Sequence, residues 1–203
     1  MPSSLFSAEI ILRLPAWIHD SLPEADLILS SPEARMDFVL DLARGNVLHQ
    51  TGGPFAAAVF DGKSGQLIAA GINLVTATGC SIAHAEIVAL TLAQQRLSSF
   101  SLVGPGLPEC ELVTSTEPCA MCLGALPWAG IRQLVCGARD EDARIVGFDE
   151  GDKPTDWVRC LERRGITVLR DVRRQAARQI LVEYANTGGL IYNGRSLADP
   201  DKS

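Results

Sequence analysis

Residues 118–122 read Pro-Cys-Ala-Met-Cys, and residues 84–86 read His-Ala-Glu. A tetrahedral zinc ion takes neutral imidazole and thiolate ligands, and a catalytic zinc keeps its fourth position open for water. Three residues of these segments offer such ligands: His84, Cys119 and Cys122. Glu86 follows the histidine by two residues, so its carboxylate can carry protons beside the metal without binding it. The two segments therefore predict the halves of one hydrolytic zinc site.

Both halves fall at predicted helix starts. Apolar residues recur at helical spacing over 84–97, and Pro118 begins another helix whose first turn carries the two cysteines, three positions apart on one face. Helix dipoles at these ends favour thiolate over thiol. The alternative is a closed structural site with Cys80, one helical turn before the histidine, as fourth ligand. In that alternative Glu86 would have no role.

The pattern along the chain predicts strands that alternate with helices. We expect strands over 55–60, 66–72, 111–114, 133–137 and 167–169, and helices over 32–48, 84–97, 155–164 and 173–186 and from Pro118. This order predicts a three-layer α/β/α sandwich with a mixed five-stranded sheet. We expect three parts: an N-terminal extension over 1–31, one domain over 32–192 and a polar C-terminal tail over 193–203.

Composition and charge narrow the function. The chain has 203 residues, 47% of them hydrophobic, which suits one globular domain. The formal net charge of -6 makes a nucleic acid a poor partner, because nucleic-acid binding depends on a basic surface. No apolar run is long enough for a membrane span, and no signal peptide is recognisable. We therefore expect a cytoplasmic protein that acts on a small molecule, with no nucleic-acid or membrane partner.

Two longer runs carry a resemblance to a known family. The run Ala83-His84-Ala85-Glu86-Ile87-Val88-Ala89-Leu90 and the run from Ser115 to Leu126 resemble the cytidine-deaminase superfamily, and the resemblance extends over 32–192. Residues 138–143 and 145–150 are similar to its bacterial guanine deaminase branch. The resemblance implies a cytidine deaminase-like fold, a Zn²⁺ cofactor and a homodimer.

The resemblance also implies a substrate pocket. Its residues would be Asn73, Ala85, Trp128, Phe148, Glu150 and Tyr192. Glu86 would be the proton shuttle and Glu150 a second catalytic acid that recognises the base, while Tyr192 could instead cap the pocket of a partner chain. From the residues alone, other readings stay open: Asn73 as a turn residue, Trp128 as a core residue and Glu150 as part of a solvated acidic cluster.

Guanine presents its N1 hydrogen and its 2-amino group side by side, and these two donors match the two oxygens of a carboxylate. Adenine and cytosine offer a lone pair beside the amine, which a carboxylate repels. We therefore expect a hydrolase that converts guanine to xanthine and ammonia, with a side activity on ammeline. The alternatives are a deaminase of another base or nucleoside, such as cytosine, cytidine or adenosine in tRNA, and a non-catalytic zinc- or purine-binding protein.

Overall fold

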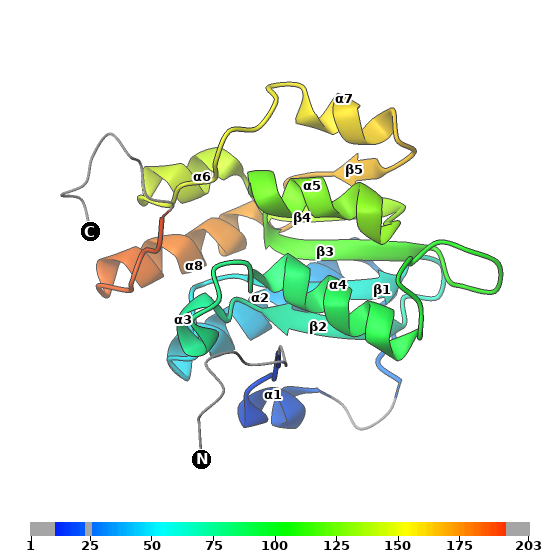
Figure 1. Ribbon diagram of the computed structural model, residues 1–203. Helices are drawn as coiled ribbons and strands as arrows, with labels where there is room; N and C mark the ends of the chain where they lie inside the picture. Colours follow the sequence, from blue (N-terminus) through cyan, green and yellow to red (C-terminus); the bar gives the residue numbers. More distant parts are fainter. Residues whose placement is uncertain (1–10, 23–25, 194–203) are drawn as a thin grey trace, which may run out of the picture.

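The computed structural model describes residues 11–22 and 26–193 of the chain. A five-stranded mixed sheet lies at its centre, with the strand order β2-β1-β3-β4-β5 (Figure 1). The strands are β1 (Ala56–Asp61), β2 (Leu67–Ile72), β3 (Cys110–Thr116), β4 (Gln133–Ala138) and β5 (Thr167–Leu169). Helices cover both faces of this sheet (Figure 1). The predicted three-layer α/β/α sandwich is confirmed.

Strand direction gathers three chain segments at one edge of the sheet. Strand β1 pairs antiparallel with both β2 and β3, so β2 and β3 run in the same direction. Strand β4 is parallel to β3. The carboxyl ends of β2, β3 and β4 therefore lie along one edge, where ligands of open α/β sheets usually bind. The segments that leave these three ends begin at Asn73, Glu117 and Arg139.

Side chains along the central strands are buried on both faces of the sheet and alternate between two cores. Ala56, Ala58 and Phe60 of β1 face a core shared with α2 (Pro32–Leu48) and α8 (Arg174–Asn186). The intervening Ala57 and Val59 face a second core. Three helices form that second layer: α4 (Ala85–Arg96), α5 (Ala120–Ala129) and α7 (Trp157–Glu162). Two apolar layers thus fix the sheet from which the site segments emerge.

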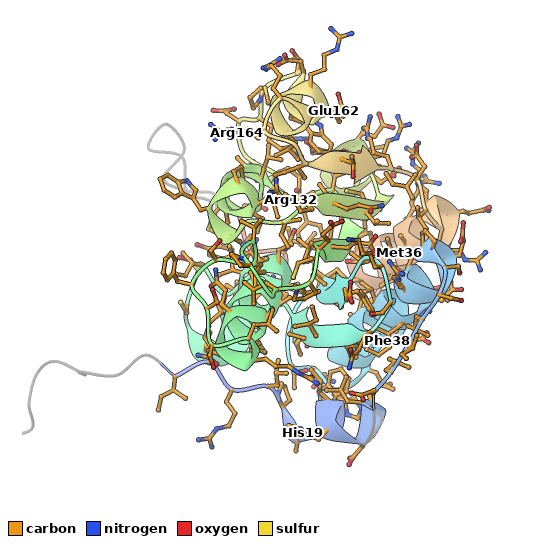
Figure 2. All side chains as sticks on the ribbon, turned by 90° about the vertical axis from the view of Figure 1, so that its right-hand side faces the viewer. His19, Met36, Phe38, Arg132, Glu162 and Arg164 are labelled. Atoms are coloured by element: carbon orange, nitrogen blue, oxygen red, sulfur yellow. The ribbon has the colours of Figure 1, made fainter. Side chains whose placement is uncertain are left out.

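The longest helix, α2, begins where its sequence predicts. The Ser31 hydroxyl accepts a hydrogen bond from the Ala34 amide at 3.1 Å, and Pro32 occupies the first helical position, where a missing amide hydrogen costs nothing. Its Met36 side chain is completely buried (Figure 2). In the same view, His19 and Glu162 lie at opposite ends of the molecule.

The sequence pattern does not predict three short helices: α1 (Ala16–Ser21), α3 (Val75–Thr78) and α6 (Asp140–Ile145). Each has six residues or fewer, too few for an apolar period to show. Helix α5 begins at Ala120, so Cys119 is its N-cap and does not lie within its first turn as predicted. Of the predicted polar tail, 194–203 lie outside the described residues.

The described part of the N-terminal extension packs on the domain. The Trp17 indole donates a hydrogen bond to Thr51, and Ile28 forms an isolated antiparallel bridge with Gln66. None of the described helices has the length and apolar composition that a membrane crossing requires.

Candidate active site

The predicted metal ligands converge. The possible ligand atoms of His84, Cys119 and Cys122 lie within 4.8 Å of one another, although the histidine and the nearer cysteine are 35 positions apart in the sequence. The distance from Cys119 Sγ to His84 Nδ1 is 3.5 Å. Tetrahedral zinc, with bonds of about 2.3 Å to sulfur and about 2.1 Å to nitrogen, requires roughly 3.6 Å between these atoms. The donor atoms and their spacing therefore fit zinc.

The electrostatics of the cysteine pair favour the thiolate at Cys119. A hydrogen bond with Cys122 lowers the pKa of the Cys119 thiol to about 4, helped by the nearby His84. The same hydrogen bond, together with burial, raises the pKa of Cys122. Cys119 is thus a thiolate at neutral pH, which is the form that binds zinc. Its position at the N-cap of α5 adds the favourable end of a helix dipole.

Glu86 lies beside this cluster, in the first turn of α4. Its Oε2 atom accepts a contact of 3.4 Å from the Cys122 thiol, and the residue is 7% exposed. Burial raises the pKa of this carboxyl above its ordinary value, with a further contribution from the charge on Cys119. A carboxyl that is both close to a metal site and easier to protonate suits proton transfer.

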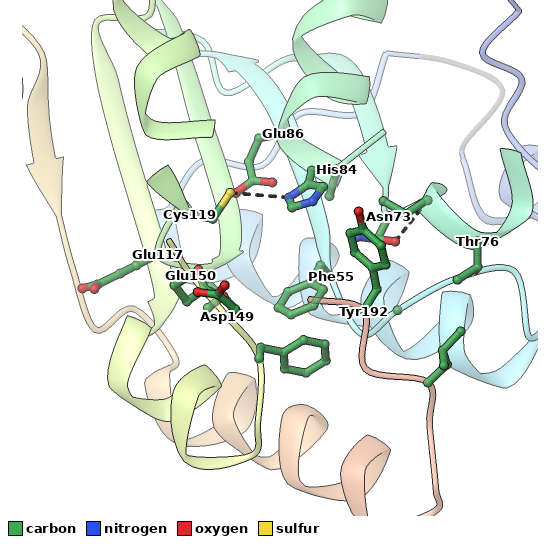
Figure 3. Close-up of a pocket in the computed structure, with 16 residues that line it drawn as sticks. Phe55, Asn73, Thr76, His84, Glu86, Glu117, Cys119, Asp149, Glu150 and Tyr192 are labelled. Atoms are coloured by element: carbon green, nitrogen blue, oxygen red, sulfur yellow. Dashed lines mark hydrogen bonds between the residues drawn. The ribbon is translucent and has the colours of Figure 1, made fainter. Parts of the chain in front are cut away.

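A pocket opens in front of the metal ligands, with an empty volume of about 640 Å³ that includes its open mouth. Its walls come from the carboxyl ends of β2 and β3, the start of α4, the segment after α6 and the C-terminal segment (Figure 3). Of the predicted site residues, the pocket is lined by Asn73, His84, Ala85, Glu86, Cys119, Phe148, Glu150 and Tyr192. Cys122 lies behind it, completely buried.

Glu150 is the second buried carboxyl of the pocket, at 6% exposure. No hydrogen bond within 11–22 and 26–193 involves its side chain, and its oxygens are not fully enclosed. Burial raises its pKa to about 8, and the charge on Cys119 acts in the same direction. The carboxyl therefore reaches the pocket, where a ligand that supplies hydrogen-bond donors can meet it.

Aromatic rings form the apolar wall. Phe148 packs edge-on against Phe55, with 4.8 Å between ring centroids, and lies 6.2 Å from the ring of Tyr184. The hydroxyl of Tyr184 donates a hydrogen bond to the Leu190 carbonyl at 2.8 Å, which brings the C-terminal segment to the pocket. This wall suits the flat face of a heteroaromatic ring.

Asn73 is held by its neighbours. Its side-chain oxygen accepts a hydrogen bond from the Val75 amide at 3.3 Å, which leaves its NH₂ group for the pocket. The side-chain nitrogen of Asn46 donates a hydrogen bond of 2.9 Å to the backbone carbonyl of Asn73. The same nitrogen of Asn46 donates to the Gly53 carbonyl at 2.8 Å. The completely buried Asn46 thus joins two segments of the pocket rim.

The prediction that Trp128 lines the pocket of its own chain is wrong. This residue is 88% exposed on the outer side of α5 and does not line the pocket, because it lies near the far end of the helix from Cys119. Cys80, the alternative fourth ligand, is not part of the metal group among the described residues, so the site has three protein ligands and room for a fourth. Tyr192 lies at the pocket of its own chain, half exposed.

Several pocket residues are absent from the sequence-based set: Gly53, Phe55, Val75, Thr76, Thr116, Glu117, Asp149 and Leu190. Phe55 enters the pocket because its carbonyl pairs with the Asn73 amide at 3.0 Å, just before β1. The signal that could have found it is the sheet order: β1 begins at the edge where β2 ends. Without that order the sequence offers no reason to place these residues together.

The chain belongs to a zinc-binding deaminase family: the family model for the cytidine and deoxycytidylate deaminase zinc-binding region matches residues 29–138. This match covers the site residues at the starts of α4 and α5, namely His84, Ala85, Glu86, Cys119 and Cys122. The chain is accordingly a zinc-binding hydrolase of the deaminase class.

Several deaminases of named substrate are similar to the chain. The chain is 40% identical over 111 residues to guanine deaminase from Bacillus subtilis (strain 168), which covers 52% of this chain and 67% of that protein. A solved structure of guanine deaminase from Nitrosomonas europaea is 49% identical, with a TM-score of 0.85 over 89% of this chain and 98% of that chain. The tRNA-specific adenosine deaminase of Haemophilus influenzae is 31% identical over 116 residues, 57% of this chain and 62% of that protein.

Proposed function

We propose that the protein hydrolyses guanine to xanthine and ammonia. The observation that carries this proposal is the buried Glu150 carboxyl, which lines the pocket and makes no hydrogen bond with another described residue. Guanine offers it two adjacent donors, the N1 hydrogen and the 2-amino group. Adenine would present a lone pair there, and a site built on such hydrogen bonds rejects mismatched ligands strongly. The similarity to two guanine deaminases supports the same choice.

Solved relatives support the assignment of two pocket residues. A relative in complex with 8-azaguanine carries a substituted asparagine, with 50% identity and a TM-score of 0.85 over 88% of this chain and 98% of that chain. Another such complex carries a substituted glutamate. Those two positions lie the same number of residues apart as Asn73 and Glu150. We therefore assign Asn73 to donate hydrogen bonds to acceptor atoms of the base and Glu150 to accept from its donors.

The roles of the residues follow from their positions. Zinc on His84, Cys119 and Cys122 supplies a Lewis acid that brings the pKa of water to about 7. Glu86 takes a proton from the attacking water and delivers it to the ring nitrogen beside the attacked carbon C2. It then helps to protonate the departing 2-amino group, so that one water is consumed and one ammonia is released. Glu150 holds the same amino group in place, and Phe55 and Phe148 cover the ring.

The first experiment measures ammonia release by the zinc-loaded protein from guanine, guanosine, adenine, cytosine, cytidine and ammeline at equal concentrations. We expect strong activity on free guanine, a weaker one on ammeline, which shares the donor pair, and little on the nucleosides. Activity confined to another substrate would contradict the role of Glu150 and keep the zinc chemistry. Absence of turnover with every compound would favour tRNA as substrate or a binding function.

We also propose a homodimer that forms on the outer face of α5. Met121 and Trp128 lie seven positions apart on this helix, hence on one face, and they are 38% and 88% exposed. The adjoining loop adds Phe100 at 91% exposure and Val103 at 41%. An exposed group of large apolar side chains of this kind marks an interaction surface. Sedimentation analysis should give a dimer for the parent protein and a monomer for Trp128→Glu.

We also propose that the protein is located in the cytoplasm. The chain has six cysteines, and none of them forms a disulfide. Two are zinc ligands that must stay reduced, which a reducing compartment ensures. Fractionation of the native cells should recover the protein with cytosolic markers.

A further inference from the structure

Lys153 is a buried cation behind the proposed active site. Its side chain is only 4% exposed. The ammonium group donates to the Pro118 carbonyl at 2.8 Å and to the Asp140 carboxylate at 2.8 Å, and it lies 5.7 Å from the centre of the Trp157 ring. An ammonium has three donors, and its burial costs free energy unless they find partners. Lys153 is therefore held in one place by specific contacts.

These contacts join segments that are distant in the sequence. Pro118 directly precedes the metal ligand Cys119, and Asp140 is the first residue of α6. Lys153 itself lies three residues beyond Glu150. One ammonium group thus connects the segment that carries a zinc ligand, the segment that carries the substrate-binding carboxylate and the helix after β4.

Hydrogen bonds to two backbone carbonyls also hold the segment of Glu150 in place. The Glu150 carbonyl accepts a hydrogen bond of 2.9 Å from the Ala120 amide, at the start of α5. The next carbonyl, that of Gly151, accepts one of 2.7 Å from Arg144. The side chain of Lys153 completes this set of contacts from the far side of the segment, so that the backbone of Glu150 has little freedom to move relative to the cysteines.

Lys153 does not line the substrate pocket. It lines a separate hollow with Trp157 and Arg170, where Arg170 forms an ion pair of 2.6 Å with the buried Glu117. Figure 3 shows that the Glu117 carboxylate points away from the other labelled pocket side chains, and Glu117 also lines this second hollow. Any effect of Lys153 on the reaction must therefore pass through the segments that it holds.

We infer that Lys153 is a positioning residue, which sets the distance between the Glu150 carboxylate and the zinc ligands and so aligns C2 of the base for attack. The inference rests on the guanine deaminase function proposed above. A misplacement of about 1 Å can cost about 10²-fold in rate. Removal of the ammonium therefore weakens catalysis although it touches neither metal nor substrate.

The test compares Lys153→Met with Lys63→Met. Lys63 is an exposed lysine that forms a surface ion pair with Glu109, so it undergoes the same chemical change away from the site. We expect Lys153→Met to keep one zinc per chain and to lose roughly 10- to 100-fold in kcat/KM for guanine, through a lower kcat from the misaligned C2 and a higher KM from the displaced Glu150 carboxylate. Lys153→Arg should restore part of the loss because it keeps the charge and the donors. Lys63→Met should match the parent protein.

A double-mutant cycle with Glu150→Gln separates positioning from a purely structural role. If Lys153 acts through Glu150, Lys153→Met should have little further effect in the Glu150→Gln background. An unchanged kcat/KM per zinc in Lys153→Met, or fully additive losses in the cycle, would overturn the inference. If Lys153→Met does not fold, the same cycle is run with Lys153→Arg, whose longer and bulkier guanidinium cannot take the place of the buried ammonium without displacing its neighbours and should still raise KM.

The two proposals fail in different ways. A parent protein without activity on guanine would reject the proposed function, whatever its variants do. An active parent protein whose Lys153 variants keep the parent kcat/KM for guanine would reject the positioning role alone.

Discussion

At the scale of single residues, Glu86 shows how burial prepares a side chain for chemistry. It is a carboxyl with 7% exposure beside two thiols and an imidazole, and burial raises its pKa. A carboxyl in such surroundings exchanges protons with neighbouring groups more readily near neutral pH than an exposed one does. It lies next to the metal ligands without belonging to the group of three that can hold the ion.

Glu86→Gln keeps the shape of this side chain and removes its proton transfer. We expect a loss of about 10²- to 10⁴-fold in kcat for guanine, because general acid–base catalysis contributes factors of that size. Zinc content, measured by atomic absorption, should stay at the parent value. A variant that loses zinc together with activity would instead assign Glu86 to the metal.

Glu150 predicts a pH dependence. Burial, then the charge of Cys119, raises its pKa to about 8, whereas Lys153 acts in the opposite direction. The protonated form has lost acceptor capacity, so guanine should bind best once the carboxyl is ionised. We expect kcat/KM for guanine to rise with pH along a limb that lies above 4.5 and not beyond about 8, because a zinc ion lowers the pKa of a neighbouring acid.

The control for this limb is Glu150→Gln, which has no carboxyl to titrate there. Its residual kcat/KM for guanine, measured from pH 5 to pH 9, should lack the Glu150 limb. An identical limb in the variant and the parent protein would assign the titration to another group, such as the metal site.

Single residues also show which predictions need a fold. The zinc ligands and Glu86 are predictable because their spacing within short motifs carries the chemistry. Trp128 lies a few residues beyond the same motif, but the turn of α5 directs it outward, and no local pattern distinguishes an exposed aromatic residue from a pocket residue. Phe55 was missed because its place depends on the pairing of β1 with β2.

At the scale of elements, α2 is connected to the pocket rim by Asn46. This side chain is completely buried; it donates to the carbonyls of Gly53 and Asn73 and accepts from the Thr51 hydroxyl at 2.7 Å. The Thr51 hydroxyl in turn accepts from the Trp17 indole at 3.1 Å. A chain of hydrogen bonds thus runs from α1 through α2 to the end of β2.

Asn46→Ala should lower the free energy of unfolding by about 1–3 kcal/mol, since it leaves the Asn73 carbonyl without its donor, whereas the Gly53 carbonyl still accepts from the Phe55 amide. It should also raise KM for guanine, because Asn73 loses one of its supports. Urea denaturation and steady-state kinetics measure the two effects. Ser31→Ala is the matched control: it removes the cap of the same helix, costs about 1 kcal/mol, and should leave KM unchanged. Equal KM values in both variants would contradict the role of Asn46.

Elements also explain how far sequence reasoning reaches. The long helices and the strands β1 to β4 are predicted to within a few residues, because apolar periods of five residues or more are visible in the sequence, and the three-residue β5 is predicted as well. The short α3 and α6 are not, since each depends on contacts made after folding. In α6 the Asp142 carboxylate caps the helix through the Arg139 amide at 2.9 Å and pairs with Arg174 from α8, far along the chain.

At the scale of the whole molecule, the sheet order turns separate motifs into one site. Strands β2, β3 and β4 deliver their carboxyl ends to one edge, and the starts of α4 and α5 lie at that edge. The sequence predicts that the strands exist but contains no local sign of their order, so the resemblance alone places Asn73 and Glu150 together, and the place of Phe55 beside Asn73 becomes visible only in the folded chain.

The zinc site should therefore stabilise the whole fold as well as supply the chemistry. Its ligands tie α4 to α5, two helices that follow different strands, and an ion that binds only the folded chain stabilises it by about 4 kcal/mol when its free concentration is 1,000 times Kd. Removal of zinc by a chelator should abolish ammonia release and lower Tm, and added zinc should restore both. Cys122→Ser, which loses a buried ligand, should bind zinc weakly and unfold near the Tm of the stripped parent protein, whereas Cys160→Ser, outside the site, should behave like the parent protein. A chelated protein with an unchanged Tm would mean that the two ligand segments hold their arrangement through packing alone, with the metal contributing only to the reaction.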